Sequence, residues 1–227
     1  MSYVTVAADP PWPYKDRLTM SAVKRGAASN YPTMSLNEIA TLYRPEFVLP
    51  DRPKRQATLC DYALDDVGFL FLWTTWTHLL NGNATYVANY WGYEAKQVVP
   101  WIKGRVELLR PGLRGSGTDL YDACLTLNMG MGRITRGVTE PLVICTRGDG
   151  WSKLLKRKNQ NGLVLDWGDD LLLDSRGAHS AKPDSAYDMI ESIVPGPYVE
   201  LFARKRRPGW TTWGNELPAH ENPGMEW

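Results

Sequence analysis

The chain has 227 residues, with 26 Lys and Arg against 25 Asp and Glu, so its formal net charge at pH 7 is +1. This length fits one domain with a full α/β core, and a 43% hydrophobic content excludes a disordered or collagen-like chain. A charge so near zero excludes a uniformly basic coat protein, so any nucleic-acid surface must be a local patch. No apolar run approaches the roughly 18 residues that span a bilayer, and residues 1–4 resemble the start of a strand, not a signal peptide. We therefore expect a cytoplasmic protein with no membrane partner.

The cysteines and histidines are widely spaced and form no C-x-x-C pattern. A disulfide framework or a Cys/His zinc site is therefore not expected, and we predict no metal. The thiols of Cys60, Cys124 and Cys145 are expected to be structural. Ten Trp and 11 Tyr make a high aromatic content, which serves either core packing or stacking on flat rings such as bases.

The first half of the chain alternates apolar runs with loop signals. Residues 3–8 predict a buried strand that ends at a proline pair, because Pro cannot donate to a strand ladder. Ser35 and Glu38 form a capping box, which predicts a helix over about 36–43. A buried strand is expected over 67–73 (VGFLFLW), a helix over about 77–91 and a further strand over 93–102.

Periodicity fails from about 103 to 136, where Gly and Arg recur, and we expect a long loop there. A strand is predicted over 139–146, and a second irregular region over about 148–180. Pro183 is expected to open a helix to about residue 193, followed by strands over 198–203 and 210–213. Strands alternating with helices indicate an α/β protein with a mostly parallel, doubly wound sheet.

The end of the first strand holds Asp9-Pro10-Pro11-Trp12. In open α/β sheets, ligands bind at the carboxyl ends of the strands. The prolines lack N–H donors and are expected to leave their carbonyls free as acceptors, and an ionised Asp9 also only accepts. Acceptors beside an indole face suit a flat ring with an exocyclic amine, such as adenine. The alternative is a turn in which Pro gives rigidity and Trp packs.

Glu200 lies in a later strand, where a carboxylate could accept from ribose hydroxyls or could simply be a surface charge. No G-x-G-x-x-G follows any predicted strand, which disfavours a dinucleotide oxidoreductase. No G-x-x-x-x-G-K-[ST] occurs, so a phosphate-cradling loop of that type is absent as well.

Several of these motifs occur together in an order that resembles a known family. In this order they resemble the N6-adenine methyltransferase family that includes the catalytic subunit of the eukaryotic messenger-RNA adenosine methyltransferase. The compact chain resembles its bacterial and phage members. The motifs are Ala8-Asp9-Pro10-Pro11-Trp12, Tyr31-Pro32-Thr33-Met34-Ser35, Phe69-Leu70-Phe71-Leu72-Trp73, Trp91-Gly92-Tyr93-Glu94, Trp101-Ile102-Lys103, Arg136 with Glu140 and Gly148, His179-Ser180-x-Lys182-Pro183, Val199-Glu200-Leu201-Phe202-Ala203-Arg204 and Trp213-Gly214-Asn215-Glu216.

The resemblance implies a Rossmann-like fold in permuted order, with the acceptor motif first and the cofactor strand near the end of a single domain, 1–227. It implies S-adenosylmethionine as cofactor. By this resemblance Asp9 and the Pro10 carbonyl hold the N6 amine, and Trp12 walls the base. Lys182 is expected to pair with the cofactor's carboxylate. The remaining cofactor residues are Glu200, Phe202, Arg204, Asn215 and Glu216, and the substrate side has Tyr31, Trp73, Trp91, Lys103, Arg136 and Glu140.

The resemblance also implies a nucleic-acid partner in a bacterial or phage-infected cell. DNA is favoured over RNA because no RNA-binding addition is visible. The alternatives are RNA N6-adenosine methylation, a catalytically silent nucleic-acid-binding subunit, and methylation of cytosine N4, whose enzymes more often carry Ser and Tyr where Asp9 and Trp12 stand. Two departures stand out. Eight residues precede Asp9, where relatives often carry a segment that touches the cofactor's adenine. Glu216 replaces a frequent Gln.

Overall fold

The computed structural model describes residues 3–13, 33–42, 64–108, 123–127, 137–154, 171–175, 181–214 and 217. In chain order the strands and helices are β1 (Tyr3–Ala8), α2 (Leu36–Ala40), β2 (Leu64–Trp73), α3 (Trp76–Leu80), α4 (Asn83–Tyr90), β3 (Glu94–Leu108), β4 (Ala123–Leu127), β5 (Thr139–Arg147), β6 (Leu172–Asp174), α5 (Asp184–Ile193), β7 (Tyr198–Leu201) and β8 (Trp210–Trp213).

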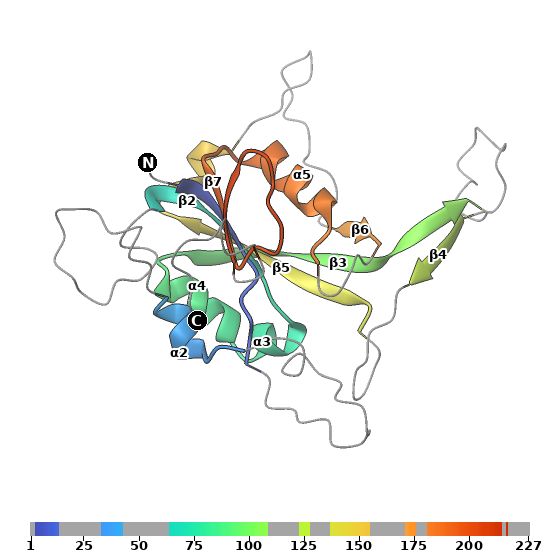
Figure 1. Cartoon of the computed structure of the whole chain (residues 1–227), viewed down its shortest axis with the longest axis horizontal. Helices are drawn as coiled ribbons and strands as arrows, with labels where there is room; N and C mark the ends of the chain where they lie inside the picture. Colours follow the sequence, from blue (N-terminus) through green and yellow to red (C-terminus); the bar gives the residue numbers. More distant parts are fainter. Residues whose placement is uncertain are drawn as a thin grey trace, which may run out of the picture.

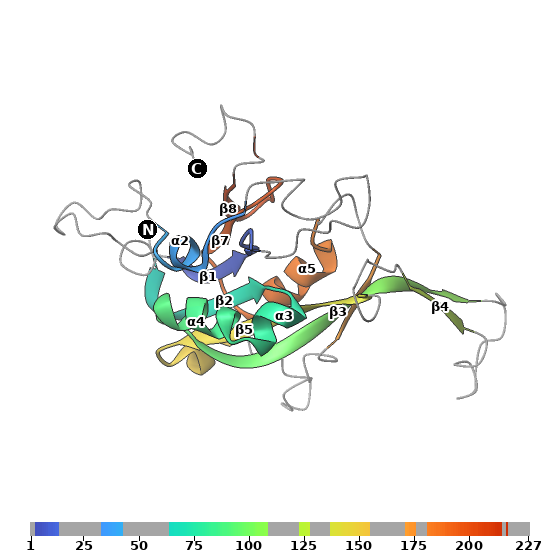
Figure 2. The ribbon, with the colours of Figure 1, turned by 90° about the horizontal axis from the view of Figure 1, so that it is seen from below.

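The strands form one sheet in the order β4-β3-β5-β2-β1-β7-β8 (Figure 2). The short strand β6 lies beside β3 (Figure 1). β1 runs parallel to β2 and β7, and β7 is parallel to β8. β6 is parallel to β3. β5, however, is antiparallel to both β2 and β3, and β4 is antiparallel to β3. The sheet is therefore mixed but mostly parallel, as predicted: β2, β1, β7 and β8 form one parallel part, and β6 adds a parallel pair at β3.

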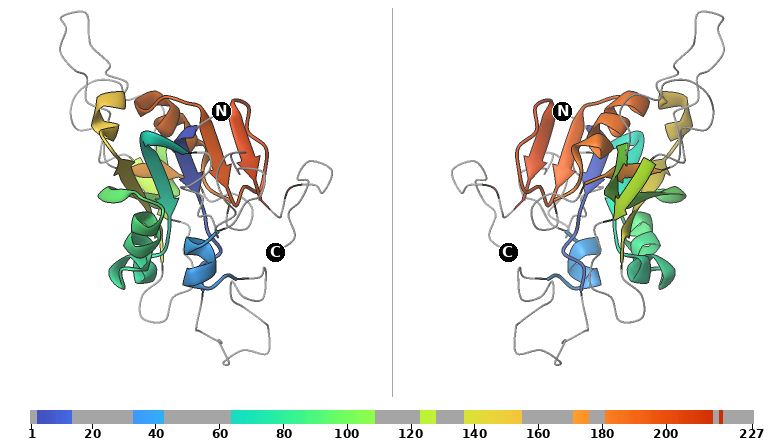
Figure 3. Two further views of the ribbon diagram at one scale, coloured as in Figure 1. Left: turned by 90° about the vertical axis from the view of Figure 1, so that its left-hand side faces the viewer. Right: turned by 90° about the vertical axis from the view of Figure 1, so that its right-hand side faces the viewer.

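Alternate residues of the central strands face two separate apolar layers. Leu70 and Leu72 of β2 belong to the core under α2 and α4. Phe69 and Phe71 face the other way, into the core under α5. Figures 1 and 3 show these helices on opposite sides of the sheet. Burial on both faces explains why β1 and β2 are continuous apolar runs, and it confirms the α/β class.

The prediction of one continuous helix over 77–91 is wrong, because the structure has two helices there, α3 and α4. The break lies at Gly82, whose φ of 73° is the left-handed conformation that glycine adopts most easily. The predicted helix after the Ser35 cap ends at Ala40, with Thr41 as its C-cap. The capping box itself is confirmed, since Ser35 and Glu38 exchange both hydrogen bonds.

The loop predicted over 103–136 is also wrong in part. β3 continues to Leu108 and pairs with β4, from Gly104 opposite Leu127 to Leu108 opposite Ala123. This two-stranded ribbon projects from one end of the sheet (Figures 1 and 2). Residues 109–122 and 128–136 lie outside the described residues. In the region predicted irregular, 148–180, a short 3-10 turn and β6 are found. None of the described helices is long and apolar enough to cross a membrane.

The sheet order places the predicted acceptor motif at a switch point. β1 has β2 on one side and β7 on the other. The chain leaves β1 toward α2 on one face and reaches β7 after α5 on the other face. The Asp9 N–H lies 3.4 Å from the Leu201 carbonyl oxygen, so the ends of β1 and β7 stay side by side. Such a point, beyond the carboxyl ends of the strands, is where open α/β sheets bind ligands.

Candidate active site

The Asp9-Pro10-Pro11-Trp12 segment is a tight turn that uses both proline carbonyls. The Trp12 N–H donates to the Pro10 oxygen over 2.8 Å, and the Met34 N–H donates to the Pro11 oxygen over 2.9 Å. The prediction that these carbonyls are free acceptors is therefore wrong as stated. A carbonyl oxygen has two lone pairs, however, so Pro10 keeps acceptor capacity.

Trp12 is packed inside the protein, with only 3% of its surface exposed. Its Nε1 donates to the Trp73 carbonyl oxygen over 3.0 Å. His78 stacks on its ring, with centroids 5.1 Å apart and planes inclined by 26°. Asn83 contacts His78 Nδ1 at 2.9 Å. One face of the expected base wall is thus occupied by a histidine from α3, which the sequence analysis did not single out.

The imidazole of His78 is held neutral by its surroundings. Burial lowers its pKa from the ordinary value, and a hydrogen bond to the Pro13 backbone opposes that shift. A neutral ring can accept at Nδ1 from the Asn83 amide while its other nitrogen donates to the Pro13 carbonyl. His78 therefore ties the end of the Trp12 turn to the first residues of α3 and α4.

A chain of alternating charges runs into the end of β1. Lys182, whose side chain is only 6% exposed, places its Nζ 3.1 Å from Asp9 Oδ1 and in closer contact with Glu140 Oε1. Lys103 Nζ lies 2.8 Å from the other Glu140 oxygen, Oε2. Arg204 Nη2 lies 4.0 Å from Asp9 Oδ2. Five charged side chains from five separate segments thus meet at one place.

These charges shift one another's pKa values in opposite directions. Burial raises the pKa of Asp9, and nearby Glu140 adds to the rise, while Lys182 and Arg204 oppose it. Burial acts to lower the pKa of Lys182, but attraction to Asp9 and Glu140 outweighs burial and raises it. Burial would raise the pKa of Glu140, yet Lys182 and Lys103 bring it below its usual value. Lys182 is therefore firmly protonated at neutral pH, and it favours the charged form of Asp9 against the effect of burial.

Two tryptophan rings lie beneath the lysines of this chain. Lys182 Nζ is 5.2 Å from the centroid of the Trp73 ring, and Lys103 Nζ is 5.0 Å from that of Trp101. The two indoles meet edge to face, 5.9 Å apart. Trp73 is almost fully buried. It lies under the Lys182 ammonium, which cation–π attraction helps to hold.

The end of β7 carries a second buried carboxylate. Glu200 Oε1 accepts from the Tyr187 hydroxyl over 2.5 Å, and burial raises the pKa of Glu200. The next residue but one, Phe202, has a φ of 62°, which is strained for a side chain of its size. Gly214 packs so tightly that a Cβ there would lie 1.7 Å from the Ala203 oxygen. The segment between β7 and β8 is thus held in a demanding conformation beside Asp9.

Other predicted site residues lie elsewhere or are not described. Trp91 is fully buried in the core under α2 and α4, where its Nε1 donates to the Ile39 and Ala40 carbonyl oxygens. It is not brought to the charge chain. The remaining four, Tyr31, Arg136, Asn215 and Glu216, lie outside the described residues.

An exposed indole stands at the rim of the charge chain. Trp76, at the start of α3, is 41% exposed, and its Nε1 donates to Thr139 Oγ1 over 2.9 Å. Thr139 directly precedes Glu140 in β5. Sequence reasoning missed Trp76 because one Trp among ten gives no signal of its exposure.

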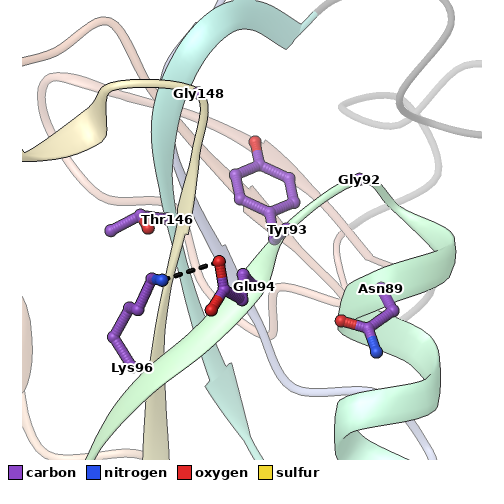
Figure 4. A pocket seen from close by; sticks show the side chains of 7 residues that line it. All are labelled: Asn89, Gly92, Tyr93, Glu94, Lys96, Thr146 and Gly148. Atoms are coloured by element: carbon purple, nitrogen blue, oxygen red, sulfur yellow. Dashed lines mark ion pairs between the residues drawn. The ribbon is translucent and has the colours of Figure 1, made fainter.

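A hollow of about 380 Å³ lies at the opposite end of the strands from Asp9. Figure 4 shows its lining, where the Lys96 ammonium faces the Glu94 carboxylate at the start of β3. Thr146 and Gly148 border it at the end of the antiparallel β5. The hollow is therefore separated from Asp9 by the length of the strands, and it is not part of the charge chain.

The structure is that of an α/β protein with a cluster of buried ion pairs at the switch point of its sheet. The MT-A70 family model matches residues 59–216, so the chain belongs to the MT-A70 adenine N6-methyltransferase family. The predicted family resemblance is confirmed.

Among similar proteins, the type II methyltransferase M.MunI of Mycoplasma sp is 27% identical over 232 residues, covering 95% of this chain and 78% of that protein. The human N(6)-adenosine-methyltransferase catalytic subunit METTL3 is 27% identical over 220 residues, covering 95% of this chain but only 28% of METTL3. The human N(6)-adenine-specific methyltransferase METTL4 is 55% identical over 40 residues, 17% of this chain and 8% of METTL4.

Proposed function

We propose that this protein transfers a methyl group from S-adenosylmethionine to the exocyclic N6 amine of adenine in DNA. The observation that carries the proposal is the Asp9–Lys182 ion pair at the carboxyl end of β1. It puts an ionised acceptor at the switch point of the sheet, as an amine-binding site requires. In this proposal 1–227 is one Rossmann-like domain in permuted order, in which β1 carries the amine site and β7 the cofactor site.

Asp9 and Pro10 would receive the two N–H groups of the amine. The Asp9 carboxylate accepts one, and the second lone pair of the Pro10 oxygen accepts the other. These bonds turn the nitrogen lone pair out of the ring and stabilise the positive charge that develops on nitrogen. One such contact contributes about 2.7–4 kcal/mol to a transition state. Lys182 and Arg204 act to lower the pKa of Asp9 and so favour the charged form that this role needs.

The residues at the ends of β1 and β7 fit the cofactor by their chemistry. S-adenosylmethionine would supply an electrophilic methyl group on a sulfonium: the S–CH3 bond would break as the N–CH3 bond forms, the sulfur would leave as a neutral thioether, and the methylated nitrogen would lose one proton to water. Glu200 is a buried acceptor suited to ribose hydroxyls, and Tyr187 fixes one of its oxygens. Phe202 and Arg204 follow it in the strained segment after β7. Asn215 and Glu216 complete the proposed set.

Lys182 is proposed to pair with the cofactor's carboxylate as well as with protein carboxylates. Its ammonium has three N–H donors. Asp9 and Glu140 engage the ammonium on two sides, so a third donor can serve the cofactor. This links the two proposed sites, because the same cation would orient the acceptor of the amine and hold the methyl donor.

DNA is favoured over RNA by the extent of the similarity. The chain spans most of a type II methyltransferase but only about a quarter of METTL3. RNA methylation is the second candidate, since the METTL3 match covers the same share of this chain. A catalytically silent subunit is disfavoured by the intact Asp9 and its ion pair with Lys182.

The experiment is methylation of defined single- and double-stranded oligonucleotides, DNA and RNA, with radiolabelled S-adenosylmethionine and nucleoside analysis of the product. We expect N6-methyladenine in DNA. The Asp9→Asn variant, which keeps the shape but removes the charge, is the matched control for contaminating activity. Label confined to RNA, or found in N4-methylcytosine, would replace the proposed substrate. Cofactor binding without any transfer would favour the silent subunit.

A further inference from the structure

The charge chain begins at a lysine that is remote from the proposed amine site. Lys103 belongs to β3, at the base of the ribbon where β4 begins to pair with the next residue, Gly104. Its N–H donates to the Val138 oxygen over 2.8 Å, and its ammonium lies over the Trp101 ring. These contacts direct it at Glu140 Oε2, while Lys182 engages Oε1. Each oxygen of Glu140 thus has its own cation.

We propose that Lys103 is a positioning residue for methyl transfer, which acts on Asp9 through Glu140 and Lys182. The inference rests on the proposed function. With Lys103 present, two cations and two carboxylates alternate, and Lys182 remains shared between Glu140 and Asp9. Without Lys103, the buried carboxylates of Asp9 and Glu140 compete for the Lys182 ammonium. Arg204, 4.0 Å from Asp9, is the more distant cation. Glu140 then draws Lys182 from Asp9, and the acceptor of the amine loses its fixed position.

The titration of the carboxylate pair follows from the same geometry. Asp9 faces Lys182, Glu140 and Arg204, and its charge also acts on Glu200 of β7 and Tyr187 of α5. Glu140 faces Lys182 and Lys103. Removing Lys103 removes a cation from this group, so the first proton enters the pair at a higher pH. An opposite charge at this range lowers an acid's pKa by about 1–3 units, and a shift of about one unit is expected on its loss. Both carboxylates must be ionised for the arrangement to work, so the acid limb of activity moves with that proton.

The competing role for Lys103 is direct contact with a phosphate of the nucleic acid. That role predicts a different set of changes. Loss of a phosphate contact weakens nucleic-acid binding and flattens the slope of log affinity against log salt by about 0.9 on duplex DNA. It leaves the titration of buried carboxylates in the free protein unchanged. The two roles are therefore separable in one set of variants.

The test compares Lys103→Met and Lys103→Arg with Lys96→Met. Lys96 lies on the same strand, pairs with Glu94 and is similarly exposed, 25% against 21% for Lys103, but it borders the hollow at the opposite end of the strands. Carbon-13 NMR of the side-chain carboxyls in the free protein follows the titration without any turnover. The pH dependence of kcat follows catalysis.

We expect Lys103→Met to raise the carboxyl pKa and the acid limb of kcat by about one unit, with Lys103→Arg restoring both and Lys96→Met changing neither. In a Glu140→Gln background, Lys103→Met should change the pKa and the acid limb of kcat very little, because the carboxylate through which Lys103 acts is already absent. Unchanged carboxyl titration in folded Lys103→Met overturns the inference, as does a flattened salt slope without a pH shift. If the wild type methylates no adenine, the proposed function fails. The NMR titration still decides the role of Lys103 in the charge chain.

Discussion

Lys182 Nζ lies 3.1 Å from Asp9 Oδ1, so a residue just before α5 holds the first side chain after β1. Both side chains are largely shielded from water. A cation before a helix N-terminus gains nothing from the helix dipole, and two carboxylates account for its place there. The pair ties the proposed amine site to the proposed cofactor site.

Asp9→Ala should abolish methyl transfer. The fold should stay intact, and cofactor binding should remain detectable. The substitution removes the acceptor that stabilises charge on the amine, a loss of about 2.7–4 kcal/mol or more in the transition state. Single-turnover kinetics and calorimetric titration of S-adenosylmethionine measure the two effects. A variant that keeps activity within a few-fold of wild type would remove Asp9 from the mechanism.

Lys182→Met should destabilise the protein as well as weaken cofactor binding. Asp9 and Glu140 would be left buried beside each other without their shared cation, and breaking a buried pair costs about 3–5 kcal/mol. Denaturant unfolding measures this loss, with Lys96→Met as the control at an exposed pair. Calorimetry should also find cofactor affinity reduced at least about tenfold, since a hydrogen bond to a charged group contributes about 1.5–3 kcal/mol. Wild-type stability in Lys182→Met would contradict the buried ion chain.

Glu140→Gln should reduce stability in a pH-dependent way. Because Lys182 and Lys103 lower the pKa of Glu140 below its ordinary value of 4.5, the native state favours the charged form. That contribution is fully present above pH 4.5 and disappears as the pH falls through the lowered native pKa. The stability gap between wild type and variant should therefore be widest near neutral pH and close in acid. Urea unfolding across this pH range measures it, and a gap that widens in acid would reverse the sign of the argument.

Trp76→Ala should weaken binding of nucleic acid without affecting cofactor binding. An exposed indole whose nitrogen is fixed by Thr139 offers a flat face for a base next to the target, and such stacking is worth about 1–3 kcal/mol per base. Trp76→Phe should retain most of the affinity. Tyr90→Ala is the matched control, because Tyr90 is 45% exposed against 41% for Trp76 but ends α4 near the opposite hollow. Equal losses from Trp76→Ala and Tyr90→Ala would mean that neither ring has a specific role.

Local signals in the sequence predict much of this fold correctly. The proline pair ends β1 at Ala8, and the Ser35–Glu38 capping box starts α2. Pro183 precedes α5 as predicted. Each of these depends on neighbouring residues only. The thiol of Cys145 is free and buried, and burial raises its pKa to about 12, while Cys60 lies outside the described residues.

Contacts between distant segments explain what the sequence does not predict. The pairing of Gly104 with Leu127 forms a strand in a region that lacks apolar periodicity. The ion pairs of Lys103, Glu140 and Lys182 join three segments, and their residue types alone give no distances. His78 stacks on Trp12 although the two residues are 66 positions apart in the sequence. The charges of the ion-pair residues and the aromatic rings of His78 and Trp12 are visible in the sequence, but their partners are not.

The place of β1 at the middle of the sheet has a consequence for how the chain folds. Thr5 is paired with Phe69 on one side and with Tyr198 on the other, so the second neighbour is made almost two hundred residues later. During synthesis β1 and β2 can associate early, while the other edge of β1 stays unpaired until β7 emerges. Non-local pairing of this kind slows folding and leaves an apolar strand edge open to aggregation. β1 is thus completed long after it is made, and the site at its end can form only once β7 is present.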